Sequence, residues 1–293
     1  MELAQRRAKV ARMGGFWALI KSRQTVLLVT TGFCAYALTR GLPFDPIEAM
    51  WMAGGLLLSI SGCTVLNMLM DRDIDGQMER TAGRPLPAGH VRPLEAGLFG
   101  GLLSAVGLGL SFGLDLRFGV MIALGFAFDL LVYTAWLKRR TPLSIVFGGV
   151  AGGMPVLAGR VSALGRVDLV GLLLCSSILL WIPSHILTLA LRYADDYRRA
   201  GVPVWPNVYG PRATRLFIAA ANLLNTLVLA ACAFLLRVHP VAQAALLAIS
   251  LGLFGFSALQ LVAPTERRNW LLFKLASLYM LTSSLLLTVG SVL

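Results

Sequence analysis

Acidic residues and histidine are scarce in this chain, and their scarcity limits the class of protein that it can be. Only 14 of the 293 residues are Asp or Glu, three are His, and charged residues of both signs make up 14% of the sequence. Hydrophobic residues make up 57%. A soluble domain of this length needs more polar surface to remain wetted, so the composition excludes an ordinary soluble protein.

Cysteine is also sparse, and no two cysteines are close together in the sequence. Cys34, Cys63, Cys175 and Cys232 each stand inside an apolar run, and none belongs to a CxxC pair. Zinc sites and disulfide frameworks are recognised by paired spacings, so neither is expected. We interpret the four thiols as small hydrophobic side chains buried in a membrane protein.

Long apolar runs occupy most of the chain, and each run of roughly 18 or more residues predicts a transmembrane helix. The expected fold class is therefore all-α, a polytopic membrane protein of about nine transmembrane helices in a single domain, residues 1–293. Residues 1–14 form a basic N-terminal segment without a cleavage pattern, so no signal peptide is expected. The nine predicted spans are 16–39, 47–70, 94–114, 117–137, 143–159, 167–191, 213–236, 239–263 and 270–291.

The net charge of +12 would suit a polyanion, but the basic residues lie in short connections between the spans. Twenty of the 26 Lys and Arg residues fall on the side of the N-terminus, five fall on the other side, and Lys274 lies in the last span. The positive-inside rule then places the N-terminus in the cytoplasm and the C-terminus outside. No basic domain remains to bind nucleic acid.

Two long loops on the predicted cytoplasmic side, about 71–93 and 192–212, hold a large share of the acidic residues. Acids beside cytoplasmic arginines do not help topology, so they need a functional explanation. The six acids in these loops are Asp71, Asp73, Asp75, Glu79, Asp195 and Asp196.

The first loop begins with three oxygen-bearing side chains at helical spacing. Asn67, Asp71 and Asp75 are separated by four residues each and share one helix face if the second span continues. Two aspartates at this spacing repel unless a cation lies between them. Mg²⁺ binds carboxylates together with substrate phosphates, so we expect a magnesium site. Asp73 points to the opposite side and is a weaker candidate.

Arginines follow these acids at a similar spacing. Arg80 and Arg84 stand four residues apart, before two prolines that end any helix. The planar guanidinium group suits phosphate oxygens. Acids, a bridging cation and arginines together predict a diphosphate site.

The second loop extends a span that carries the only histidine deep within an apolar run. His185, Arg192 and Asp196 fall near one helical face, and Pro183 breaks the helix upstream of them. A broken helix frees backbone groups and opens space within a bundle. His185 is therefore a candidate acceptor-binding residue, with a structural hydrogen bond as the alternative.

The fourth span carries an acid within the membrane and ends in a basic cluster. Asp129 lies one turn before Tyr133, and Lys138 and Arg139 follow at the cytoplasmic end. An intramembrane acid indicates function, although a hydrogen bond to a neighbouring hydroxyl group is an alternative. The basic pair is a candidate for binding phosphate, and it is also a simple topology signal.

These motifs resemble a known family. The pattern Asn67-xxx-Asp71-xxx-Asp75, followed by Met78-Glu79-Arg80-Thr81 and Arg84, resembles the first signature of the UbiA superfamily of intramembrane prenyltransferases. The run from Ser61 to Arg84 is similar to its protohaem IX farnesyltransferase (haem O synthase) branch. The resemblance covers roughly residues 15–215. The other similar segments are Tyr133–Arg139, Gly148–Pro155 with Gly159, and Trp181–Gly210.

The resemblance implies a nine-helix bundle around a central cavity in the inner cell membrane, with the active site on the cytoplasmic side. It implies farnesyl diphosphate and haem B as substrates, Mg²⁺ as cofactor, the lipid bilayer as surroundings and haem A synthase as a partner. The implied catalytic residues are Asp71, Asp75, Arg192 and Asp196. The implied metal ligands are Asn67, Asp71, Asp75 and Asp196. Diphosphate binding is implied for Arg80, Arg84, Lys138, Arg139 and Arg192, and acceptor binding for His185, Tyr133 and Asp129.

Two departures from the pattern affect these expectations. Ser184, not proline, precedes His185, and Arg192 stands four residues before Asp196, where the superfamily often has a second acid. A prenyltransferase acting on another acceptor, such as an aromatic quinone precursor, therefore remains an alternative. A transporter is a remote alternative, because no internal repeat is apparent and the acids lie at one face of the membrane.

Overall fold

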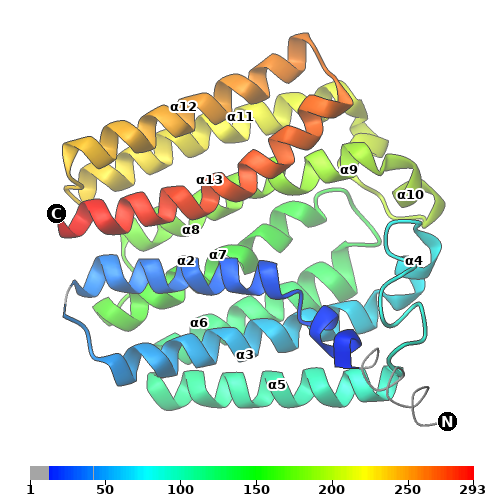
Figure 1. Ribbon diagram of the computed structural model, residues 1–293, viewed down its shortest axis with the longest axis horizontal. Coiled ribbons are helices and arrows are strands. Elements are labelled where there is room, and N and C mark those ends of the chain that lie inside the picture. The colour runs from blue at the N-terminus through cyan, green and yellow to red at the C-terminus, as the bar shows by residue number, and fades with distance from the viewer. Residues whose placement is uncertain (1–12, 42) are drawn as a thin grey trace.

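The computed structural model describes residues 13–41 and 43–293. Every regular element within these residues is helical, and the long helices run side by side through the molecule (Figure 1). This confirms the expected fold class, an all-α polytopic membrane protein. Of the predicted basic N-terminal segment, residues 1–12 lie outside the described residues.

Nine helical segments in the described part of the chain correspond to the nine predicted spans. Eight are long and apolar enough to cross a membrane. The ninth, α2, is less apolar because polar residues occupy its first turn, and it packs between α3, α7 and α13. The segments are α2 (Ser22–Arg40), α3 (Pro46–Met70), α5 (Pro93–Leu114), α6 (Leu116–Ala127) with η1 (Phe128–Leu137), α7 (Ser144–Leu164), α8 (Leu169–Ile182) with η2 (Pro183–Leu187) and α9 (Thr188–Arg192), α11 (Trp205–Leu235), α12 (Pro240–Val262) and α13 (Glu266–Val292).

The nine segments form a closed ring. Following the packed neighbours around it gives α5, α6, α7, α8, α11, α12, α13, α2, α3 and again α5. A contact between α2 and α7 crosses the interior and divides the ring into two halves. One half holds α3, α5 and α6, and the other holds α8, α11, α12 and α13 (Figure 1). The short helices α4 (Arg72–Gln77) and α10 (Ala194–Arg199) lie together at one end of the bundle, and the C-terminus lies at the other.

The contact between α2 and α7 depends on glycine. A Cβ atom on Gly159 would lie 2.0 Å from the carbonyl oxygen of Gly32, and a Cβ atom on Gly32 would lie 2.9 Å from the carbonyl oxygen of Pro155. No side chain fits at such distances, so the two backbones touch directly. Beside this contact, fully buried Tyr36 and Phe118 belong to an apolar cluster that fills the bundle away from α4 and α10.

The first predicted span, 16–39, is divided in two. Residues 13–19 form a separate helical turn, and Lys21 adopts a left-handed conformation (φ 45°) before α2 begins. The hydroxyl group of Thr25 donates to the carbonyl oxygen of Ile20 and satisfies the backbone at the break. The side chain of Leu19 is fully buried against the start of α5, which explains why this turn leaves the axis of α2.

Two of the spans widen into π-helix where polar residues occur. η1 continues α6 and carries Asp129 and Tyr133, and η2 begins at Pro183 and carries His185. π-helical turns are rare and are frequent at functional sites. Both turns therefore mark the part of the bundle where binding is expected.

Acidic residues at the end of the bundle away from α4 and α10 have structural roles. Asp45, Asp115 and Asp168 each accept hydrogen bonds from backbone amides in the first turn of α3, α6 and α8. Asp168 also pairs with buried Arg160 at 2.6 Å. These are N-caps, which stabilise helix starts by about 1 kcal/mol each.

The glycine contact generates a prediction about stability. Gly159→Ala places a methyl group against the α2 backbone, and we expect overpacking to lower the free energy of unfolding by about 1–3 kcal/mol. Gly252→Ala is the matched control, because nothing lies within 4 Å of a Cβ atom there. Thermal denaturation in detergent measures both variants. Equal stability of the two would contradict the proposed close contact.

Candidate active site

A cavity of about 1320 Å³ lies between the two halves of the ring and extends to α4, the loop after α4, and the connection between α10 and α11. Its lining comes from α2, α3, α6, α7, α8, α13, both π-helical segments and these loops. Ligand pockets usually measure about 300–1000 Å³, so this cavity has room for more than one substrate. Charged residues occupy the end near α4, and apolar residues from α6, α7 and α8 line the deeper part.

The predicted ridge of Asn67, Asp71 and Asp75 lines this cavity. α3 ends at Met70, but the amide of Asp71 still donates to Asn67 O and the amide of Asp75 to Asp71 O, at 3.0 and 2.9 Å. The helical spacing therefore continues into α4. Both carboxylates are almost fully buried, with 1% and 4% of Asp71 and Asp75 exposed.

Each buried carboxylate on the ridge is paired with a cation from another segment. Lys138, which follows η1, forms an ion pair with Asp71, and Arg84 Nη1 lies 2.6 Å from Asp75 Oδ2. Burial would lower the pKa of Lys138, but Tyr133 and Asp71 outweigh it and raise the pKa above its ordinary value. A buried charge without a partner is costly, so these pairs hold the polar end of the cavity together.

Asp73 points away from the cavity, as the sequence predicts, and there it binds Arg139. The two guanidinium nitrogens of Arg139 donate to Asp73 at 2.6 and 2.7 Å, and one also donates to Met70 O. The hydrogen bonds from Arg139 lower the pKa of Asp73 to about 2. Arg139 therefore fastens α4 to the end of η1 and does not line the cavity, contrary to its predicted place beside a phosphate.

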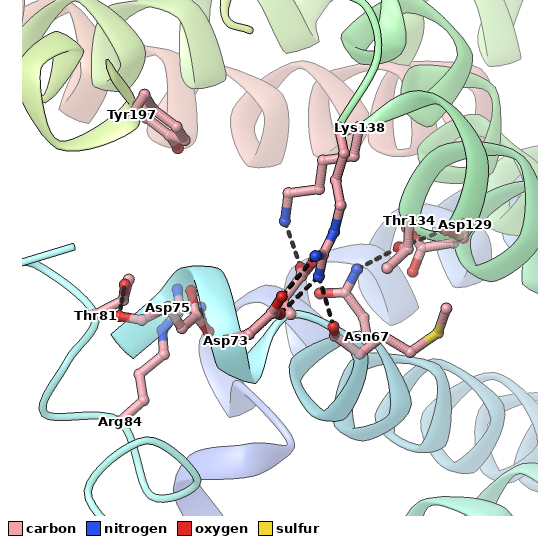
Figure 2. A network of polar contacts seen from close by, with 12 residues as sticks. Asn67, Asp73, Asp75, Thr81, Arg84, Asp129, Thr134, Lys138 and Tyr197 are labelled. Carbon is pink, nitrogen blue, oxygen red and sulfur yellow. Dashed lines mark hydrogen bonds and ion pairs between the residues drawn. The ribbon is translucent and has the colours of Figure 1, made fainter. Parts of the chain in front are cut away.

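The ridge has oxygen atoms suited to a divalent cation. Asp71 Oδ1 is buried and has no hydrogen-bond partner among the residues that the structure describes. Asn67 Nδ2 donates to Thr134 Oγ1 at 2.6 Å, and Thr134 in turn donates to Asp129 O (Figure 2). Asn67 therefore keeps its carbonyl oxygen free for a cation. Carboxylate and amide oxygens are ligands that Mg²⁺ accepts, so the donor set fits this ion.

Asp196, which the resemblance implies as a metal ligand, is not among the residues that line the cavity. It is buried, forms an ion pair with Arg199 and accepts the backbone N–H of Arg80 at 3.3 Å. In the described residues, no group of three His, Cys, Asp or Glu side chains is placed to hold one metal ion. Asp196 instead secures the loop that carries Arg80.

Arg80 and Arg192 differ in their position relative to the cavity. Arg80 lines the cavity and stacks over Tyr193 and Tyr197. Its Nε is buried and has no hydrogen-bond partner in the described part of the chain. Arg192 lies 3.6 Å from Glu266 and stacks over Trp270, outside the lining of the cavity. The helical face predicted for His185, Arg192 and Asp196 does not continue to Asp196, because the helix ends at Tyr193, before α10.

The three predicted acceptor residues all line the cavity. Asp129 Oδ2 accepts a hydrogen bond from Cys63 Sγ at 3.1 Å, so its partner is a thiol and not the hydroxyl group considered as the alternative. Tyr133 follows on η1, beside Lys138. His185 projects from η2 on the opposite half of the ring, where Ser277 lies 3.1 Å from Nδ1.

Several cavity residues were not singled out from the sequence as site residues. Lys21 lines the cavity near Arg84, Lys138 and Asp129, although its charge served only as a topology signal. Ser277 and Tyr197 also line it, and Thr134 orients Asn67 from behind. Only the contacts between segments distant in sequence reveal these residues.

The fold matches that of solved intramembrane prenyltransferases. A structure of digeranylgeranylglyceryl phosphate synthase aligns with a TM-score of 0.77 at 20% identity, covering 96% of this chain and 99% of that one. A UbiA homologue from Archaeoglobus fulgidus bound to DMAPP and Mg²⁺ aligns with a TM-score of 0.72 at 13% identity, covering 94% and 99%. At these identities the likeness concerns the fold alone.

The chain belongs to the UbiA prenyltransferase family, whose model matches residues 27–282. A protoheme IX farnesyltransferase of Archaeoglobus fulgidus is 39% identical over 261 residues, which cover 88% of this chain and 91% of the relative. One from Korarchaeum cryptofilum is 45% identical over 213 residues, covering 73% and 72%. The resemblance found in the motifs is thereby confirmed at the level of the family.

The contrast between Lys138 and Arg139 gives a prediction about prenyl transfer. Lys138→Gln removes a buried cation from the cavity, and we expect turnover to fall by about 100-fold or more. Arg139→Gln removes an outward ion pair, so turnover stays near wild type and stability falls by at most about 1 kcal/mol. Steady-state assays and thermal denaturation of both variants check this. The reverse order of activities would contradict the assignment.

Proposed function

We propose that the protein is a haem O synthase, which transfers a farnesyl group from farnesyl diphosphate to a vinyl group of protohaem IX. The observation that carries the proposal is a single cavity with a diphosphate-type site on one half of the ring and a histidine on the other. The relatives named protoheme IX farnesyltransferase, similar along most of the chain, support the choice of acceptor. The volume of about 1320 Å³ suits two large substrates together.

The donor diphosphate binds at the charged end of the cavity. Arg80, Arg84 and Lys138 neutralise its oxygens there. Asn67, Asp71 and Asp75 would hold Mg²⁺, which supplies positive charge for the departing diphosphate. Asp196 and Arg192 lie outside the cavity lining and stabilise its charged end, so we do not include them among the residues that bind Mg²⁺ or diphosphate.

The reaction breaks the bond between the allylic carbon and the diphosphate oxygen. Charge grows on the leaving group, and cations already in place stabilise it without reorganisation. The vinyl group of the acceptor forms the new carbon–carbon bond, water adds a hydroxyl group to the resulting cation, and one proton is released. Ile122, Met154 and Ile178 line the deeper cavity and exclude water from the allylic cation until that addition.

The orientation in the membrane follows from the distribution of basic residues. We propose a multi-pass protein of the inner membrane with a cytoplasmic N-terminus and α4 and α10 on the cytoplasmic side. Soluble farnesyl diphosphate then reaches the charged end directly, while its chain enters the apolar part of the cavity. Haem A synthase, which would consume haem O, remains a proposed partner.

The function is tested by product formation. Purified protein supplied with Mg²⁺, farnesyl diphosphate and haem B is expected to form haem O, detected by mass spectrometry. Parallel incubations replace haem B with an aromatic quinone precursor. Product with the aromatic compound and none with haem would overturn the acceptor, while the prenyltransferase assignment would stand.

The metal site is tested by the dependence of the rate on Mg²⁺. We expect Asp71→Asn to abolish activity at every Mg²⁺ concentration. Thr134→Val removes the group that orients Asn67, so the Mg²⁺ concentration for half-maximal rate rises about tenfold while the maximal rate is kept. Thr30→Val, which removes an exposed hydroxyl group bonded to Val26 O, is the control. Full activity of Asp71→Asn would refute the ridge as the metal site.

A further inference from the structure

The imidazole ring of His185 is held rigidly on both faces. It stacks on Trp181 with ring centroids 4.9 Å apart and on Phe273 with centroids 4.6 Å apart, and both interplanar angles are below 20°. Trp270 stacks on Phe273 in turn, and Arg192 covers the outer face of Trp270. A ring stacked between Trp181 and Phe273 cannot rotate freely, so the direction of its nitrogen atoms is determined.

Helix α13, which contacts the edge of this ring, is held in a fixed position relative to the span that carries His185. Trp181 Nε1 donates to Ala276 O at 2.6 Å, and Asn269 Nδ2 donates to Thr188 O at 2.8 Å. Both hydrogen bonds join α13 to the span that carries His185. These hydrogen bonds place Ser277, the residue after Ala276, beside the imidazole ring, with Oγ 3.1 Å from Nδ1.

The hydroxyl group of Ser277 has two neighbours and one proton. Oγ lies 3.3 Å from the carbonyl oxygen of Phe273, four residues earlier on α13, and helical serines commonly donate to that carbonyl. If Ser277 donates to Phe273 O, its oxygen accepts Nδ1–H of His185, and both contacts become hydrogen bonds. If it donates to Nδ1 instead, the contact with Phe273 O is lost. The first arrangement forms one hydrogen bond more.

The favoured arrangement leaves the proton of the neutral imidazole on Nδ1 and a lone pair on Nε2. Among the described residues, Nε2 has no hydrogen-bond partner, and it is not one of the polar atoms sealed within the protein. The His185 side chain lines the cavity together with Phe273 and Ser277. A neutral imidazole with one nitrogen donating to an oxygen is the usual state of a histidine that ligates a metal.

We propose that Ser277 holds His185 in the tautomer with a free Nε2, so that His185 binds the acceptor porphyrin as an axial ligand to its iron. This inference rests on the proposed function. It makes Ser277 a positioning residue, and it excludes the other role open to His185, donation of a hydrogen bond to a propionate group. The iron is then anchored on the half of the ring opposite to the Asn67–Asp71–Asp75 ridge.

Spectroscopy of the purified protein with haem B and without farnesyl diphosphate tests this ligation. Wild type is expected to show the absorption and EPR spectra of histidine-ligated haem. His185→Ala is expected to lose them and to regain them when imidazole is added. Ser277→Ala is expected to weaken haem binding about tenfold, and Ser277→Thr, which keeps the hydroxyl group, to restore it. Ser284→Ala is the matched control on α13, because its hydroxyl group bonds Met280 O and no imidazole.

Metal-free protoporphyrin IX, followed by its fluorescence, separates iron ligation from propionate binding. We expect its affinity to be the same for wild type and His185→Ala. An equal loss of affinity for haem and for the metal-free porphyrin would overturn the inference in favour of a propionate contact. An unchanged haem spectrum in His185→Ala, with wild type still producing haem O, would overturn the inference alone. Absence of both haem binding and haem O formation in wild type would overturn the proposed function as well.

Discussion

The pairing of buried carboxylates with cations organises the whole polar end of this bundle. Asp71 and Asp75 lie just beyond the end of the apolar helix α3, and each is bound by a basic residue from a different segment. Removing one partner of such a pair typically costs about 3–5 kcal/mol, because the other charge is left buried and alone. The pairs therefore act as structural joints between α3, α4, η1 and the loop after α4. They also concentrate charge of both signs around one opening, where an anionic substrate and a divalent cation can be accommodated together.

Most of the fold follows from the sequence because a bilayer imposes simple constraints on length and polarity. The predicted spans 47–70, 94–114 and 239–263 agree with α3, α5 and α12 to within one residue at each end. The predicted spans differ from the observed helices where a helix is interrupted. The span that was expected to begin at 213 is preceded by a short helix starting at Trp205, and Gly210, whose φ is 84°, interrupts the helix between the two parts. Hydropathy cannot detect such breaks, since they depend on packing.

The relative positions of the candidate site residues were predictable where one helix carries them. Asn67, Asp71 and Asp75 could be assigned from spacing, because the helical hydrogen bonds continue across the end of α3. Spacing failed for Arg192 and Asp196, because the chain turns at Tyr193 between them. The partners of Arg139 and Arg192, and the roles of Thr134 and Ser277, depend on residues more than sixty positions away. Such contacts leave no local pattern in a single sequence.

The direct backbone contact between α2 and α7 has a consequence for the membrane as an electrical barrier. A wide cavity lined by ionised side chains would conduct protons or other ions if it continued to the far side of the bilayer. The touching backbones at Gly32 and Gly159, with Tyr36 and Phe118 packed beside them, leave no room there for a file of water molecules. The same two glycines that let the helices cross therefore close the bundle at a level where the charged cavity has no lining residue.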